Sequence, residues 1–276
     1  SLAAAGSDVV VYDDLSAGHA EAVTRIAAAR PARRVTLVRG VILDPGQLVA
    51  VMRDESVSAV MHFAARLLVG ESVTEPLGYY RTKVTATLNL LEAMATCNVR
   101  RFVFSSTAAT FGEPIATPID EAHPQRPINP YGESKLAIER ALPHIERATG
   151  IKSITLRYFN AAGADPDGII GEDHQPEEHL IPLAIAAVRG GKPLTVFGRD
   201  YDTPDGSCVR DYVHVTDLAE AHLASLRRLE SAAPSASYNL GNGDGMSVLQ
   251  VIETVGRVVG QPVPHAAGPR RAGDPA

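Results

Sequence analysis

A tyrosine and a lysine four positions apart, Tyr131 and Lys135, are the residues whose types and spacing most directly suggest chemistry. They lie in Asn129-Pro130-Tyr131-Gly132-Glu133-Ser134-Lys135, and Pro130 suits the first turn of a helix. On one helix, side chains four apart share a face. An ammonium beside a phenol stabilises the phenolate and lowers its pKa from about 10. We therefore expect Tyr131 to exchange a proton with a substrate alcohol.

Standing alone, such a pair is more often a half-buried tyrosine beside a solvated lysine, but a second feature accompanies it. Arg101-Phe102-Val103-Phe104-Ser105-Ser106-Thr107 is typical of a buried strand that ends in hydroxyl groups. In open α/β sheets, ligands bind at the carboxyl ends of the strands. The sequence therefore predicts a three-residue site of Thr107, Tyr131 and Lys135.

The bulk composition narrows the class of protein. With 276 residues, 45% of them hydrophobic, the chain can form one large domain or two small ones. A net charge of −6 gives no indication of a nucleic-acid partner. Two distant cysteines without a CxxC motif fit a cytoplasmic protein, and neither a membrane-length apolar run nor a signal peptide is present. The histidines are scattered without metal-ligand spacing, so no metal site is expected at His123, His144, His174 or His179.

An acidic pair follows the first predicted strand. Residues 8–12 are Asp-Val-Val-Val-Tyr, and Asp13 and Asp14 come next. An acid at the end of the second Rossmann strand accepts from the adenosine ribose and favours NAD over NADP, although an acidic turn would look the same. That acid normally lies about 20 residues after a glycine-rich loop. We therefore expect a fragment without its first strand and glycine loop, and a sheet with a gap. The C-terminus also looks cut off.

The remaining pattern predicts a two-part α/β architecture. Strands and helices alternate up to Asn160, and residues 164–178 form a Gly-, Pro- and acid-rich loop typical of a lid or binding segment. We predict a Rossmann-like, doubly wound parallel sheet over residues 1–160, the NAD-binding domain. Residues 161–276 are expected to form a smaller α/β substrate-binding subdomain, from which 209–216 and 237–241 could return to the first sheet. Helices over 76–97 and 130–149 are candidates for a homodimer surface, or they simply cover the sheet.

Several motifs in this order resemble the extended, nucleotide-sugar-modifying branch of the short-chain dehydrogenase/reductase superfamily, and within it the UDP-glucose 4-epimerase family. The resemblance covers nearly the whole chain. The motifs that carry it are His62-Phe63-Ala64-Ala65, Gly70-Glu71-Ser72-Val73, Phe104-Ser105-Ser106-Thr107, Asn129 to Lys135, Leu156-Arg157-Tyr158-Phe159-Asn160-Ala161-Ala162-Gly163, Asp205 to Val215, and Pro269 to Asp274.

The resemblance implies a function and a set of site residues. Tyr131 would be the acid/base, Lys135 would lower its pKa and hold the nicotinamide ribose, and Thr107 would bond the reacting oxygen. Hydride would pass from sugar C4 to NAD and return to the other face of a 4-keto intermediate, so that NAD is regenerated. The other implied NAD contacts are Asp13, Asp14, Ser16, Ala17, Gly18, Val41, Ile42, Phe63, Ala64, Ala65, Leu67, Thr82 and Phe159. The implied UDP-sugar contacts are Asn160, Leu180, Thr195, Val196, Phe197, Arg210, Arg271 and Asp274.

Three positions depart from the family pattern, and alternatives stay open. Val41, Leu67 and Thr82 stand where the family usually has Asp, Lys and Asn, and each replacement removes a polar contact worth about 1 kcal/mol. A 4,6-dehydratase is disfavoured because Ala108-Ala109, with no acid, follows Thr107. An epimerase acting on another nucleotide sugar, or a non-catalytic nucleotide-sugar binder, stays a competing hypothesis.

Overall fold

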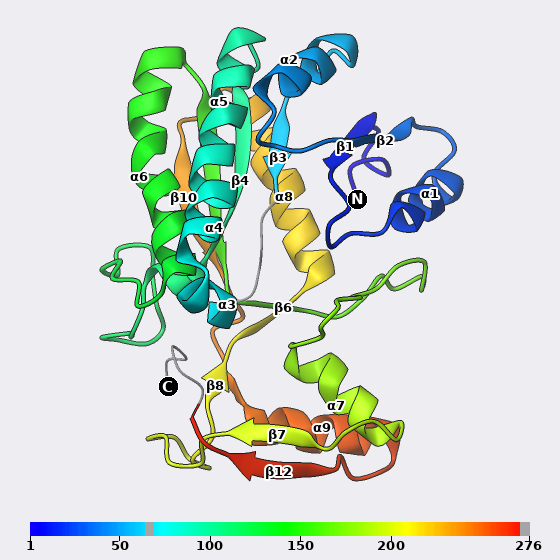
Figure 1. The fold of residues 1–276 in the computed structure, drawn as a ribbon, viewed down its shortest axis with the longest axis vertical. Helices are drawn as coiled ribbons and strands as arrows, with labels where there is room; N and C mark the ends of the chain where they lie inside the picture. The colour runs from blue at the N-terminus through cyan, green and yellow to red at the C-terminus, as the bar shows by residue number, and fades with distance from the viewer. Residues whose placement is uncertain (64–68, 271–276) are drawn as a thin grey trace.

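The computed structural model describes residues 1–63 and 69–270, which form an upper α/β unit and a smaller lower unit (Figure 1). The upper unit begins with β1 (Val9–Asp13), α1 (Ala20–Ala29), β2 (Val35–Arg39), α2 (Pro45–Asp54) and β3 (Val60–His62). It continues through α3 (Val69–Thr74), α4 (Pro76–Tyr80), the π-helical turn Arg81–Thr85, α5 (Ala86–Thr96), β4 (Arg101–Thr107), the 3-10 turn Ala108–Thr110, α6 (Pro130–Thr149) and β5 (Lys152–Tyr158).

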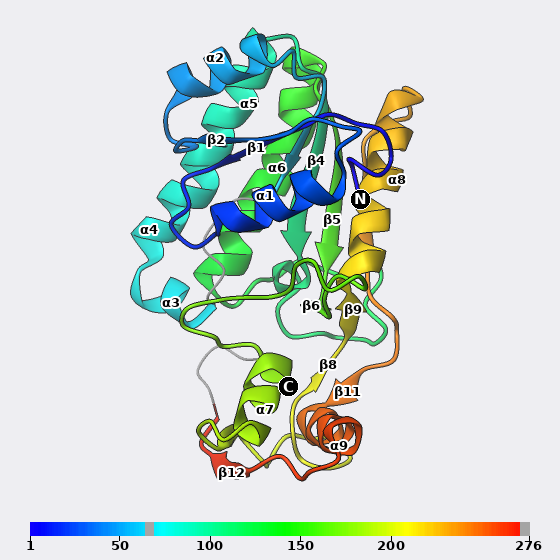
Figure 2. The same ribbon diagram turned by 90° about the vertical axis from the view of Figure 1, so that its right-hand side faces the viewer.

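A four-stranded parallel sheet in the order β10-β5-β4-β3 is the centre of the upper unit, with β10 spanning Ala236–Leu240. β4 is buried along its whole length after Arg101. Successive side chains of a strand point to opposite faces, so Phe102 and Phe104 pack under α5 and α6, whereas Val103 packs toward α8 (Val215–Glu230). Figure 2 shows helices on both faces of this sheet, as predicted for a doubly wound fold.

β1 and β2 form a separate two-stranded parallel sheet, in which Val9 pairs with Val35. Among the described residues, neither strand pairs with β3, which is the far edge of the four-stranded sheet. The predicted gap in the Rossmann-like sheet is therefore present. The two sheets lie in the same upper unit, and α1 covers the outer side of the smaller one (Figures 1 and 2).

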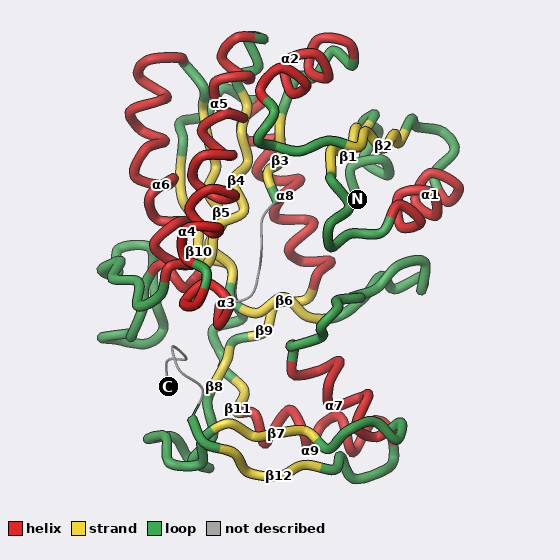
Figure 3. Tube along the Cα trace, in the orientation of Figure 1, coloured by secondary structure: helices red, strands yellow, loops and turns green. Residues whose placement is uncertain are grey.

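The lower unit has its own hydrophobic core. The elements of this unit are α7 (Leu180–Val188), β7 (Leu194–Phe197), β11 (Met246–Ser247), α9 (Val248–Val259) and β12 (His265–Gly268). β12 pairs with β7, and α7 packs against α9 around Ala184, Val196 and Ile252. α9 starts with the capping box predicted at Ser247 and Gln250. The tube in Figure 3 shows that loops make up much of this unit.

Only one of the two segments expected to return to the first sheet does so. β10 pairs with β5, but residues 209–216 are divided into β8 (Val209–Arg210) and β9 (Tyr212–His214), which pair with β11 and with β6 (Asn160–Ala162). The division falls at Asp211, whose carboxylate accepts from the backbone N–H groups of Asn242 and Gly243, 2.9 Å away in each case. The domain boundary at residue 160 stays a prediction.

In the described ranges, no helix combines the length and apolarity needed to span a bilayer.

Candidate active site

The start of α6 holds Tyr131 and Lys135 where the sequence predicts. Asn129 is its N-cap and accepts from the Gly132 N–H at 2.9 Å, and Pro130 occupies the first turn. The Tyr131 N–H also donates to the hydroxyl of Ser72 on α3, at 3.3 Å. These bonds cap the first turn of α6 and hold it against α3.

Thr107, the last residue of β4, faces the tyrosine. Its side chain interacts with the Tyr131 hydroxyl and lowers the pKa of that phenol. Its Oγ1 also accepts from the Ala109 N–H at 3.1 Å, which orients the hydroxyl. Thr107 is 9% exposed, so this contact is largely shielded from water. The structure therefore brings together Thr107 and Tyr131, which are far apart in the sequence.

Lys135 is buried, and its ammonium points into the sheet. Its Nζ donates to the Ser105 carbonyl at 2.7 Å and lies 4.9 Å from the centre of the Phe104 ring. Burial lowers the pKa of Lys135 to about 8, although nearby Glu139 opposes this change. The ammonium is thus held at the carboxyl end of β4.

A buried ion pair anchors α6 one turn after Lys135. Glu139 and Arg157 form a salt bridge of 2.7 Å, with side chains 5% and 9% exposed. Glu139 also accepts hydrogen bonds from Ser106 and, at 2.9 Å, from Gln125. Because these donors come from β4, β5 and the loop before α6, the carboxylate joins three segments around the site.

The predicted direction of the Tyr131 pKa shift is wrong for this structure. Burial of the hydroxyl raises the pKa of Tyr131, nearby Tyr158 raises it further, and the hydrogen bond with Thr107 lowers it only in part. The expected effect of Lys135 is missing because its Nζ is directed to the Ser105 carbonyl. Spacing on a helix fixes which face a side chain occupies but not where its charged end points.

A second lysine, Lys83, lies against Tyr131 and was not anticipated from the sequence. Its Nζ is 4.6 Å from the centre of the Tyr131 ring and 5.6 Å from that of Tyr79. The side chain is 2% exposed, and its Nζ has no hydrogen-bond partner among the described residues. Burial, followed by repulsion from Lys135, lowers the pKa of Lys83 to about 6. Its only sequence signal is a lysine on the helical face that also carries Thr87, Leu90 and Met94.

The carboxyl ends of β1 and β2 form a second part of the candidate site. Asp14, Val41 and Gln47 are among the residues that line a hollow of about 540 Å³ there. Asp13 and Asp14 accept from the N–H groups of Leu15 and Ser16, at 2.7 and 2.8 Å. Residues 16–18 follow as an exposed bend. This hollow and its acids fit the adenosine end of a dinucleotide.

Four other residues predicted to contact the cofactor differ in whether their side chains are exposed or are occupied by contacts within the protein. Phe63 is 55% exposed, and its ring lies 4.7 Å from that of His222. Phe159 is half-buried. Ile42 packs against the hydrophobic core, and the Thr82 hydroxyl donates to the Gly78 carbonyl at 2.9 Å. Ile42 and Thr82 are therefore engaged in packing and helix contacts.

The predicted substrate residues lie on β6, α7, β7 and β8. In β7, Thr195 and Phe197 are exposed, whereas Val196 is 1% exposed and packs into the lower core. The Val196 side chain therefore faces away from any ligand on the exposed side. Asn160 Nδ2 donates to the Asp211 carbonyl at 3.1 Å.

Two further residues predicted to contact the substrate are Leu180 and Arg210. Leu180 is the first residue of α7, and Arg210 Nη1 donates to the Val209 carbonyl at 2.8 Å. The predictions at Ala64, Ala65, Leu67, Arg271 and Asp274 lie outside the described residues.

Comparison with known proteins gives consistent results. Residues 1–241 match the family model "NAD dependent epimerase/dehydratase family". A UDP-glucose 4-epimerase of Halalkalibacterium halodurans is 48% identical over 98% of this chain and 79% of its own length. A crystal structure of UDP-glucose 4-epimerase from Brucella ovis in complex with NAD is 46% identical, with a TM-score of 0.91 over 99% of this chain and 82% of that one. The same enzyme from Bifidobacterium longum, solved with NAD+ and UDP, is 38% identical, with a TM-score of 0.92 over 99% of this chain and 82% of that one. The chain belongs to the NAD dependent epimerase/dehydratase family.

Proposed function

We propose that this chain interconverts UDP-glucose and UDP-galactose by inverting the sugar at C4, with NAD as a bound cofactor. The observation that carries the proposal is the Tyr131 hydroxyl, bonded to Thr107 at the carboxyl end of β4 with two buried lysines nearby. Relatives that are 46–48% identical over nearly all of this chain are named UDP-glucose 4-epimerase.

The described residues fit a dinucleotide. The hollow beside Asp14 suits the adenosine, and the unpartnered Lys83 Nζ and the Lys135 ammonium are polar groups suited to the nicotinamide ribose end. Phe63, Phe159 and the bend at residues 16–18 border these two regions in the proposal. When bound, NAD supplies a positively charged nicotinamide ring that accepts a hydride at its own C4.

Tyr131 moves the proton in the proposed reaction. It removes the proton of the sugar 4-hydroxyl and returns a proton to the 4-keto oxygen after the sugar has turned over. Thr107 holds the phenol in place and favours its anion, since its hydrogen bond lowers the Tyr131 pKa. Lys135 and Lys83 lie buried beside this part of the site, as polar groups for the nicotinamide ribose end. Burial of these groups keeps water away from the reacting atoms.

The UDP-sugar is proposed to lie between the upper and lower units. Thr195 and Phe197 present exposed side chains toward it, and Arg210 is suited to the pyrophosphate because a guanidinium binds phosphate oxygens in pairs. Asn160 and the start of α7 at Leu180 complete the described contacts. The division into an NAD-binding domain over 1–160 and a substrate-binding subdomain over 161–276 belongs to this proposal.

We also propose a cytoplasmic homodimer formed through residues 76–97 and 130–149. α4 and α6 pack side by side in the structure (Figure 1), and exposed apolar side chains lie in the first of the two segments, residues 76–97. Leu77 is 80% exposed, Leu88 43% and Tyr80 41%. Apolar exposure of this kind on paired helices is typical of a helix-bundle interface between subunits.

The test is turnover of UDP-galactose to UDP-glucose by the purified protein, with bound NAD measured by absorbance and mass spectrometry. We expect turnover in the wild type. The Tyr131→Phe variant should retain NAD and UDP binding but lose turnover. If wild type binds both ligands without turnover, the chain is a nucleotide-sugar binder, and if the variant turns over normally, the role of Tyr131 is wrong.

A further inference from the structure

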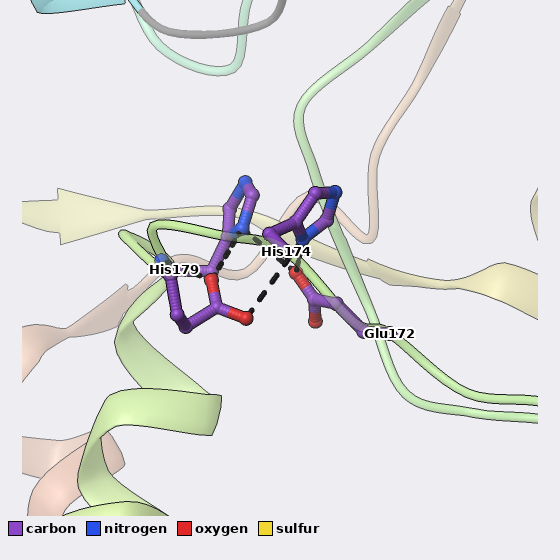
Figure 4. Close-up of side chains that lie close together, drawn as sticks. Glu172, His174 and His179 are labelled. Atoms are coloured by element: carbon purple, nitrogen blue, oxygen red, sulfur yellow. Dashed lines mark hydrogen bonds and ion pairs between the residues drawn. The ribbon is translucent and has the colours of Figure 1, made fainter. Parts of the chain in front are cut away.

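Two histidines and two glutamates converge in the segment between β6 and α7. Glu172, His174, Glu177 and His179 each offer one ligand atom, and these four atoms lie within 4.8 Å of one another. Figure 4 shows the side chains of Glu172, His174 and His179 directed at a common point. The histidines alone show no metal-ligand spacing, so no metal site was expected here; the spacing Glu-x-His-x-x-Glu-x-His, with both carboxylates included, is what brings them together.

The distances between the donor atoms are those of a metal-ligand set. His179 Nδ1 lies 2.8 Å from Glu172 Oε1 and 3.0 Å from Glu177 Oε1. His174 Nδ1 lies 3.4 Å from Glu172 Oε1 and 3.8 Å from Glu177 Oε2. Ligand atoms about 2.0–2.2 Å from a tetrahedral ion are separated by about 3.3–3.5 Å, which lies within this range. Small side-chain shifts would therefore place all four around one ion.

One nitrogen of the cluster, His174 Nδ1, makes only long contacts with the other members. His174 Nδ1 is shielded from solvent and has no hydrogen-bond partner within the described part of the chain. Buried polar atoms nearly always have a hydrogen-bond partner, so a shielded nitrogen that has none and faces two carboxylates at ion-pair distance suits coordination to a cation. His179 Nδ1 makes the shorter contacts with the two carboxylates, which leaves His174 Nδ1 with the longer ones.

We propose that Glu172, His174, Glu177 and His179 form a binding site for a divalent transition-metal ion of the zinc type. Two imidazole nitrogens and two carboxylate oxygens suit zinc, whereas magnesium and calcium prefer oxygen ligands alone. The two carboxylates balance the charge of a divalent ion. This site is separate from the proposed proton transfer at Tyr131 and does not depend on it.

The position of the site indicates a structural role. His179 is the N-cap residue of α7 and makes no side-chain capping bond, and Leu180 follows directly. On the other side, Asp173 pairs with His19 at 3.2 Å, and Asp167 pairs with Arg30 at 3.7 Å, which connects the segment to the region of α1. A bound ion therefore holds the start of α7 to a segment that also contacts the β1–β2 part of the upper unit.

The first test is zinc binding by untagged protein that is stripped with a chelator, loaded with excess zinc and then dialysed. We expect one equivalent of zinc by elemental analysis, and a thermal unfolding temperature that rises with zinc concentration, because zinc binds the folded chain. Magnesium should give neither effect. Failure to retain zinc, no rise in unfolding temperature, or an equal effect of magnesium would each overturn the proposal.

Matched variants locate the ion. His174→Gln and Glu172→Gln should weaken zinc affinity by at least about 100-fold, because losing a ligand exceeds the usual effect of losing a ligand's own partner. His265→Gln and Glu178→Gln, which change the same residue types outside the cluster, should bind zinc as wild type does. Unchanged zinc affinity in both cluster variants would show that any bound ion lies elsewhere and would refute the assignment.

A structural readout distinguishes an ion that orders the segment from one that merely sits on the surface. Zinc should slow amide hydrogen exchange in residues 172–182 of wild type by at least about tenfold, since exchange follows local opening. It should have no such effect in His174→Gln. Equal exchange with and without zinc in wild type would contradict the structural role.

Discussion

The two ends of the proposed NAD path differ in how they are built. Around Tyr131 the polar side chains are enclosed: Lys83, Lys135 and Thr107 are 2%, 5% and 9% exposed. At the other end, beside Asp14, a hollow opens on the surface, and Val41 is 46% exposed. Proton transfer benefits from exclusion of water, whereas recognition of an adenosine needs only a few well-placed acceptors. We therefore expect substitutions near Tyr131 to have much larger effects than substitutions near Asp14.

The largest effect is expected from Tyr131→Phe. Removing a general acid/base should lower kcat for UDP-galactose by about 10²–10⁴-fold. Thermal unfolding should stay close to wild type because the ring and its packing are kept. The measurement is kcat together with the affinity for UDP, and a drop in UDP affinity equal to the drop in kcat would point to a binding role instead.

The buried ion pair beneath the site should dominate stability. Arg157→Met leaves the Glu139 carboxylate buried without its cation and should lower the free energy of unfolding by about 3–5 kcal/mol. Urea denaturation measures this change. Arg140→Met, at an exposed position next to Glu139, is the control and should change stability little. A similar loss of unfolding free energy in both variants would show that the buried ion pair contributes no more to stability than an exposed charge does.

Thr107→Val tests the hydrogen bond to the phenol and has a distinct pH signature. That bond lowers the Tyr131 pKa, so its loss should raise the pKa and move the rising limb of the kcat profile to higher pH. We expect kcat at pH 7 to fall by about tenfold to 100-fold, equivalent to the loss of about 1–3 kcal/mol. A uniform loss of kcat at every pH would argue for a positioning effect alone.

Lys83→Met should stabilise the protein. The lowered pKa of Lys83, about 6, means that the unfolded chain binds a proton between about pH 6 and pH 10 that the folded chain does not. The lysine therefore costs stability increasingly as the pH falls toward 6. Replacing it with an apolar side chain should raise the free energy of unfolding by about 1–3 kcal/mol near pH 6, with the gain disappearing toward pH 10.

The control for that experiment is Lys192→Met, at an exposed position in the lower unit. Thermal and urea unfolding of both variants at pH 6, 8 and 10 would give the comparison. A gain for Lys83→Met that is the same at all three pH values would show that Lys83 is not buried in its uncharged form.

The smallest effect is expected at the open end. Asp14→Asn keeps an oxygen that can accept from Ser16 but removes the charge, and should weaken NAD binding by about 1 kcal/mol, or fivefold to tenfold. Titration calorimetry with NAD measures this. Asp8→Asn, at the opposite end of the same strand, should leave NAD affinity unchanged. If Asp14→Asn weakened NAD binding by as large a factor as Tyr131→Phe lowers kcat, substitutions at the two ends of the NAD path would not differ in size of effect as expected.

Sequence patterns predicted the backbone better than the side-chain environments. Helical spacing and hydroxyl-ended strands located Thr107, Tyr131 and Lys135, because caps and periodicity are local properties. The direction of the Tyr131 pKa shift was missed because it depends on burial and on where the Lys135 Nζ points. Lys83 was missed because its distance from Tyr131 arises only when α6 packs against the π-helical turn. Val196 was placed correctly on a strand, but its side chain packs into the core, since strand residues alternate between faces.

The late return of β10 to the upper sheet has a consequence for how the molecule is made. As the chain leaves the ribosome, β5 is complete long before Ala236–Leu240 can cover its free edge. Until then, the backbone groups from Ile154 to Tyr158 are open to pairing with other nascent chains, which is a known route to aggregation. Translation through α7, β7 and α8 to the end of β10 is therefore needed before this edge is covered, and a nascent chain stalled before residue 236 should depend strongly on chaperones.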